Sequence, residues 1–186
     1  RRMIGSLPFD IVSRDVQARE CFRRSLRLCA QVQDLRGTAL ALGCQGWSEV
    51  DLGWEARWDL MEQSVAAVRK TGDPWTTAFC LKLAYSYVPR QDRERKLKEA
   101  ALRESIDLAR QTGDRFLFCQ TLHGMGDMLM FEHDDEAAEP WYLESLRLAR
   151  EIGDKFSIYG ALSHLGSGYV RLARIERAEE CFAEGL

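Results

Sequence analysis

The chain has 186 residues and a formal net charge of −3, and 46% of its residues are hydrophobic and 30% charged. These fractions are typical of a folded protein and exclude disordered and collagen-like classes. No run of about 18 apolar residues is present, which argues against a membrane span. A nucleic-acid binder needs a dominant basic surface, so the negative charge predicts no nucleic-acid partner for this segment. Because Pro and Gly are few, we expect helices.

The predicted elements follow from an internal repeat of about 40 residues. Four segments share a serine that is followed nine residues later by an aspartate. The four pairs are Ser25 and Asp34, Ser64 and Asp73, Ser105 and Asp114, and Ser145 and Asp154. A spacing kept in phase over four copies predicts a stacked array in place of one compact domain.

A Gly-Asp pair ends three of these segments, at Gly72-Asp73, Gly113-Asp114 and Gly153-Asp154. A glycine just past the last turn of a helix supplies the left-handed position that ends it. The aspartate that follows can cap the next helix by accepting backbone N–H bonds. Each pair therefore predicts a tight turn between two helices.

Each unit then divides into two helices that carry a pattern of large and small residues. In the last unit, Leu162-x-x-Leu165-Gly166-x-x-Tyr169 is followed by Ala178-x-x-x-Phe182. This is the tetratricopeptide pattern, in which a small residue at Gly166 lets the first helix approach the second and Phe182 fills the space that Ala178 leaves. HEAT and armadillo repeats have a similar length, but they do not predict this pairing.

The period and the Gly-Asp turns resemble the long tetratricopeptide (TPR) repeats of large bacterial LuxR-type, maltose-activator-like regulators and of other STAND signal transducers. They also resemble the repeats of animal spindle-orientation adaptors, which carry Asn directly after Leu-Gly. Here that position holds Tyr85, Asp127 and Ser167, so the adaptors' mode of peptide binding does not carry over. The resemblance covers residues from about 12 to 186. It implies a cytoplasmic protein-interaction or sensor module with flanking domains in the same polypeptide.

The resulting fold expectation is an all-α, right-handed α-solenoid of antiparallel helix pairs, with about nine helices. Residues 10–34 form an unpaired second helix. The repeats that follow are expected at 35–72, 73–113, 114–153 and 154–186. Neither end of the sequence resembles the polar capping helix of a free-standing solenoid, so we expect a fragment of a longer protein.

The first helix of each pair is expected to line a concave groove that binds a peptide segment, a partner protein or a small effector. Aligning the units places eight side chains in this groove. They are Trp47, Leu81, Tyr85, His123, Asp127, Met130, Ser163 and Ser167. The alternative for each is a position in the core between helices. Two further functions stay open, namely a structural adaptor that joins two proteins without sensing, and regulatory repeats of an enzyme whose catalytic domain lies outside this chain.

The sequence predicts no enzyme, no cofactor and no metal. The three histidines are few and scattered, and no nucleophile and base can be paired. The acidic segment from Glu132 to Glu136 could hold a divalent cation, but capping acids in a solvated turn explain it as well. The charged segment from Pro89 to Lys98 is either a basic partner-binding loop or a solvated face.

Six cysteines are present, and no two lie within three residues of each other, so redox and zinc half-sites are absent. We expect free thiols that pack in the core, and hence a reducing compartment. Pro140 is an anomaly, since a proline beyond the first turn of a helix starting near Asp135 should kink that helix or delay its start.

Overall fold

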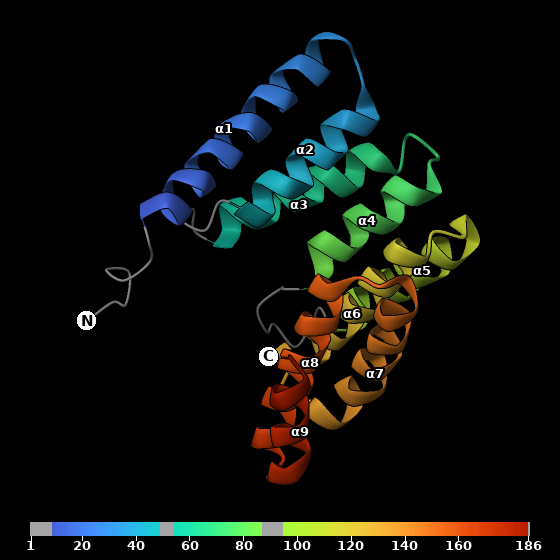
Figure 1. Cartoon of the computed structure of the whole chain (residues 1–186). Helices are drawn as coiled ribbons and strands as arrows, with labels where there is room; N and C mark the ends of the chain where they lie inside the picture. The colour runs from blue at the N-terminus through green and yellow to red at the C-terminus, as the bar shows by residue number, and fades with distance from the viewer. Residues whose placement is uncertain (1–8, 49–53, 87–94, 186) are drawn as a thin grey trace.

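The computed structural model describes residues 9–48, 54–86 and 95–185, and all of the regular structure in these ranges is α-helical. The helices are α1 (Phe9–Gln31), α2 (Leu35–Ser48), α3 (Trp54–Val68), α4 (Pro74–Tyr85), α5 (Arg95–Thr112), α6 (Arg115–Phe131), α7 (Asp135–Ile152), α8 (Lys155–Arg171) and α9 (Ile175–Gly185). They follow one another along the array from α1 at one end to α9 at the other (Figure 1). The expected all-α solenoid is confirmed. Within these ranges, no helix is both long enough and apolar enough to cross a membrane.

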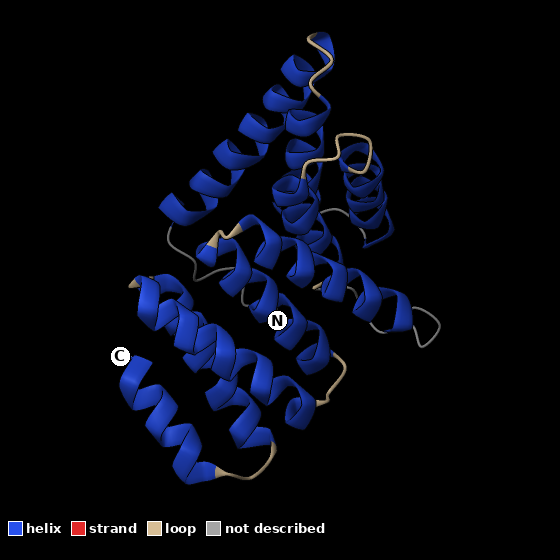
Figure 2. Cartoon of the chain, turned by 90° about the vertical axis from the view of Figure 1, so that its right-hand side faces the viewer, coloured by secondary structure: helices blue, strands red, loops and turns tan. Residues whose placement is uncertain are grey.

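The helices pack as antiparallel neighbours (Figure 2). Helices α2 and α3, α4 and α5, α6 and α7, and α8 and α9 form pairs, and α1 packs on α2. The first helices α2, α4, α6 and α8 also contact one another in succession. Within the described residues, the second helices α3, α5, α7 and α9 do not approach one another as closely. The array therefore has an inner side formed by the first helices.

The predicted turns are confirmed. Gly72, Gly113 and Gly153 have φ angles of 66°, 72° and 71°, which is the left-handed conformation that a glycine adopts without steric cost. In the turn after α5, the carboxylate of Asp114 accepts the backbone N–H of Leu117 at 2.9 Å and caps α6. Asp73 and Asp154 cap α4 and α8 in the same way.

The repeated serine makes the same buried hydrogen bond in three pairs. The hydroxyls of Ser64, Ser105 and Ser145 donate to main-chain carbonyl oxygens of the first helix in the same pair. The acceptors are Ala39 at 2.7 Å, Ala78 at 2.7 Å and Cys119 at 3.1 Å. In each of these repeats the serine therefore makes a hydrogen bond between the paired helices, and the aspartate nine residues later caps the next helix.

Glycines at the predicted close approaches lie against large rings. A Cβ atom on Gly166 would stand 2.5 Å from the Phe182 ring, and one on Gly126 would stand 2.7 Å from the Tyr142 ring. Real Cβ atoms do not approach other atoms this closely, so only glycine fits at either position. The predicted close approach at Gly166 is present, and the residue that lies against this glycine is Phe182.

All six cysteines are free, as expected, but only Cys80 and Cys119 are fully buried. Burial raises the pKa of Cys80 to about 11, which keeps its thiol protonated and inert. Cys21 is exposed, so the expectation of core packing does not hold for it. Pro140 lies inside α7, which nevertheless begins at Asp135, so the proline does not delay the start of the helix.

Candidate functional site

The eight side chains expected in the groove differ widely in exposure. Trp47 on α2 is 38% exposed, whereas Leu81 on α4 and Asp127 on α6 are 0% exposed. Tyr85, His123, Met130, Ser163 and Ser167 are half-buried. Leu81 packs with Met61 and other core residues and is a core residue. Neither Leu81 nor Asp127 offers its side chain to a partner, because both are fully buried.

The N-terminal part of the groove holds the aromatic residues. Tyr85 packs edge-on against Trp58 of α3, with 5.6 Å between ring centroids and an interplanar angle of 77°. This edge-to-face geometry is the favoured arrangement of two aromatic rings. Tyr85 therefore has a packing role, while Trp47 stays partly exposed.

At the C-terminal part, the structure brings together three side chains that can bind protons or cations. His123 and Asp127 lie one turn apart on α6, and His164 comes from α8, the first helix of the next pair. Nε2 of His123 lies 3.5 Å from Oδ1 of Asp127, and Nδ1 of His164 lies 3.1 Å from the same oxygen. The two imidazole centroids are 5.0 Å apart. The histidines are scattered in the sequence, and stacking of the repeats joins these two.

Tyr142 of α7 forms one wall of this His–Asp–His cluster. Its hydroxyl donates to Oδ1 of Asp127 at 2.9 Å and lies 3.7 Å from the sulfur of Met130. Its ring is 5.1 Å from that of His123 and 5.3 Å from that of His164. The glycine at Gly126 makes room for the ring, so the repeat pattern itself brings the hydroxyl to the carboxylate.

The electrostatics of the cluster combine burial with opposite charges. Burial lowers the pKa of His123 to about 4, although Asp127 opposes this shift, so the imidazole is neutral at neutral pH. Burial alone would raise the pKa of Asp127, but His164, His123 and Lys82 lower it below its usual range. Burial also lowers the pKa of Lys82 on α4, and Asp127 opposes that shift. The cluster thus contains the buried carboxylate of Asp127 beside the neutral imidazole of His123.

Other charged segments have local structural roles. In the segment from Glu132 to Glu136, Asp134 caps α7, and Glu132 lies 3.1 Å from Arg95. Asp135 pairs with Arg171 through two hydrogen bonds, at 2.6 and 2.7 Å. These contacts agree with capping and ion pairing as the role of the acids.

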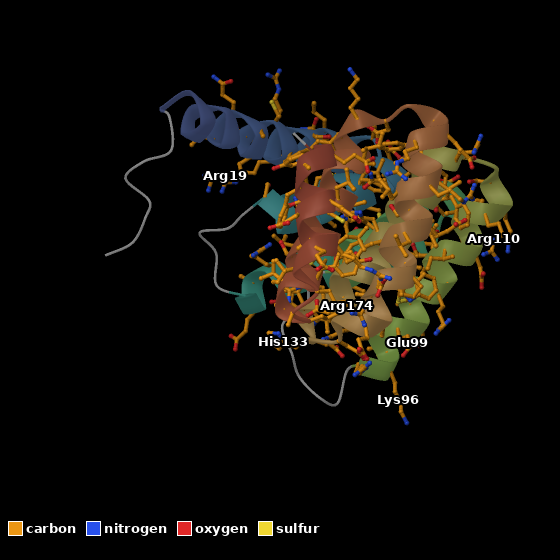
Figure 3. All side chains as sticks on the ribbon, turned by 60° about the horizontal axis from the view of Figure 1, so that its bottom comes forward. Arg19, Lys96, Glu99, Arg110, His133 and Arg174 are labelled. Carbon is orange, nitrogen blue, oxygen red and sulfur yellow. The ribbon has the colours of Figure 1, made fainter. Side chains whose placement is uncertain are left out.

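In the charged segment from Pro89 to Lys98, residues 89–94 lie outside the described residues. On α5, the side chain of Lys96, which belongs to this segment, points outward, as does that of Arg110, which lies beyond it (Figure 3).

The His–Asp–His cluster could hold a cation, because it offers two imidazole nitrogens and a carboxylate oxygen within 4.8 Å of one another. His123 and Asp127 were named in advance as groove residues, whereas His164, Tyr142 and Lys82 were not. The spacing of His123 and Asp127, four residues apart on one helix, was the available sequence signal. No protein-family model and no curated protein matches this chain.

Proposed function

We propose that this chain is a non-enzymatic binding module of the TPR type that receives an extended or helical protein segment against its inner side. The observation that carries the proposal is the succession of contacts from α2 through α4 and α6 to α8, which joins four first helices into one continuous surface. A repeat array offers such a surface to a partner without needing a catalytic centre.

The exposed side chains of the first helices support this assignment. Trp47 on α2 and Tyr159 on α8 are exposed residues of first helices near opposite ends of the array, and half-buried Met130 lies on α6 between them. Exposed aromatic residues supply much of the binding energy in protein interfaces. We therefore assign Trp47 as an anchor residue for the bound segment.

The repeat of about 40 residues and its Gly-Asp turns support a place within a larger bacterial signalling or transcription-regulatory protein of the STAND kind. In that setting the module senses a partner protein or a small effector, and flanking domains produce the output. Six free cysteines favour a reducing compartment such as the cytoplasm.

The proposal is tested by selecting peptides from a displayed random library against the immobilised chain and measuring their affinity by calorimetry. We expect an enriched sequence family with an apolar anchor. Trp47→Ala is expected to weaken its binding by about 2 kcal/mol, roughly a thirtyfold rise in Kd. The matched control is Leu97→Ala, which removes an exposed apolar side chain from the outer helix α5 and should leave the Kd unchanged.

Two results would count against the proposal. One is a failure to enrich any peptide family from the library. The other is binding that Leu97→Ala weakens and Trp47→Ala does not, because this would place the peptide on the outer helices. Circular dichroism of each variant separates lost binding from lost folding.

A further inference from the structure

Two polar atoms in the His–Asp–His cluster lack the partners that buried polar atoms ordinarily have. Among the described residues, neither Oδ2 of Asp127 nor Nδ1 of His164 has a hydrogen-bond partner. Nδ1 of His164 lies 3.1 Å from Oδ1 of Asp127, but not in hydrogen-bonding alignment. Leaving a buried polar atom unsatisfied is costly, and here two such atoms belong to two side chains of one cluster. An ion bound by the cluster would engage both side chains.

The spacing of the three side chains matches what a small transition-metal ion requires. Ligand atoms about 2.0–2.1 Å from zinc at tetrahedral angles stand roughly 3.3 Å apart. The observed separations from Oδ1 of Asp127 are 3.5 Å to Nε2 of His123 and 3.1 Å to Nδ1 of His164. The three ligand atoms all lie within 4.8 Å of one another. Binding one ion requires the three side chains to adjust until all three separations are roughly 3.3 Å.

The surroundings are also those of a metal site. Metal-binding carboxylates are ordinarily held by further hydrogen bonds, and the Tyr142 hydroxyl supplies one to Asp127. Two imidazoles and one carboxylate suit zinc and its first-row neighbours, whereas Ca²⁺ and Mg²⁺ prefer oxygen ligands. The His164 side chain is 29% exposed, which gives an ion a path into the cluster.

We propose that His123, Asp127 and His164 form a zinc site that joins α6 to α8. Among successive first helices, α6 and α8 share the fewest close backbone approaches, so an ion held from both sides would join these two helices where the first helices are least in contact. The fourth position on the ion is open to water or to a group of a bound molecule. This inference does not depend on the binding of a peptide.

The test uses the whole chain, reduced and stripped of metal by a chelator, and titrates it with Zn²⁺ in a calorimeter and with Co²⁺ in a spectrophotometer. We expect one Zn²⁺ per chain with a Kd of about 1 µM or tighter. Co²⁺ should give the intense visible bands of four-coordinate cobalt without a sulfur-to-cobalt charge-transfer band, because the ligands are nitrogen and oxygen. Zinc should also raise the melting temperature, since only the folded chain brings these three ligands together.

Two kinds of variant locate the ion. His164→Ala, at the more exposed edge of the cluster, should raise the Kd for zinc at least about tenfold. It should also abolish the rise in melting temperature that zinc causes. Tyr142→Phe keeps the ring and removes the hydroxyl. It should weaken zinc binding by about 10- to 100-fold, as the loss of a hydrogen bond to a metal ligand does in other metal sites. The matched control is His133→Asn, which removes an imidazole from the loop before α7 at a position with φ of 61° that Asn tolerates.

The proposal is overturned if the wild-type chain binds no zinc, or if His164→Ala binds it as tightly as wild type does. A thiolate charge-transfer band on Co²⁺ would also overturn it, by assigning the ion to cysteines. If His164→Ala fails to fold by circular dichroism, the wild-type cobalt spectrum and Tyr142→Phe decide the question.

Discussion

Gly126 and Tyr142 lie so close that a Cβ atom on residue 126 would stand 2.7 Å from a carbon of the Tyr142 ring. The hydroxyl at the far end of the same ring donates to Oδ1 of Asp127 at 2.9 Å. One position of the repeat pattern therefore serves two purposes. It packs α6 against α7, and it places a hydrogen-bond donor in the His–Asp–His cluster.

Replacing Gly126 tests the packing half of this relationship. We expect Gly126→Ala to lower the free energy of unfolding by about 1–3 kcal/mol, because the added methyl group overlaps a fully buried ring. Urea denaturation followed by circular dichroism measures the change. The matched control is Gly168→Ala on α8, where a Cβ atom would meet its nearest neighbour at 3.5 Å, an ordinary contact. Equal losses in the two variants would contradict a special role for Gly126.

Replacing a repeated serine by alanine should lower the stability of the fold, because it removes the hydroxyl that joins the paired helices. Ser105→Ala removes a buried hydrogen bond of 2.7 Å to the carbonyl of Ala78, and we expect the free energy of unfolding to fall by about 1 kcal/mol. Ser163→Ala, on the half-buried face of α8, should change it by less than about 0.5 kcal/mol. If Ser105→Ala is as stable as wild type, the serine is not needed to join the paired helices.

The cap at Asp114 predicts a dependence of stability on pH. The backbone N–H of Leu117 and the indole N–H of Trp75 lower the pKa of Asp114 below its usual range. A carboxylate with a lowered folded-state pKa contributes stability that is present above its unfolded pKa, near 3.9, and is lost as the pH falls through the folded value. We therefore expect Asp114→Asn to be less stable than wild type at pH 7.

Urea denaturation of both proteins between pH 7 and pH 3 measures this contribution. The difference between them should be constant down to about pH 5 and should shrink as the pH falls further, because acid also removes the charge from the wild-type cap. A difference that stays the same at every pH would show that the charge of Asp114 does not stabilise the turn.

Much of the fold could be predicted from the sequence because its determinants are local. Gly153 and Asp154 specify a left-handed turn and a cap within two residues, and Gly166 and Phe182 lie in one helix pair. The His–Asp–His cluster was missed because His123 and His164 are far apart in the chain and meet only when the repeats stack.

The groove was predicted less well for a related reason. Aligning the repeats assumes that residues at equivalent positions are equally exposed. In the folded chain, neighbouring side chains decide how much of each residue remains in contact with solvent. Asp127 is closed off by Tyr142 and the histidines, while Trp47, at the equivalent position of the first unit, stays exposed.

Hydrogen exchange of the chain with and without a selected peptide tests the central claim most directly, namely that the inner side of the helix array is a binding surface. The account predicts that the peptide slows amide exchange in α2, α4, α6 and α8 and leaves the outer helices α3, α5 and α7 unchanged. Protection confined to the outer helices, or to none of the helices, would contradict it.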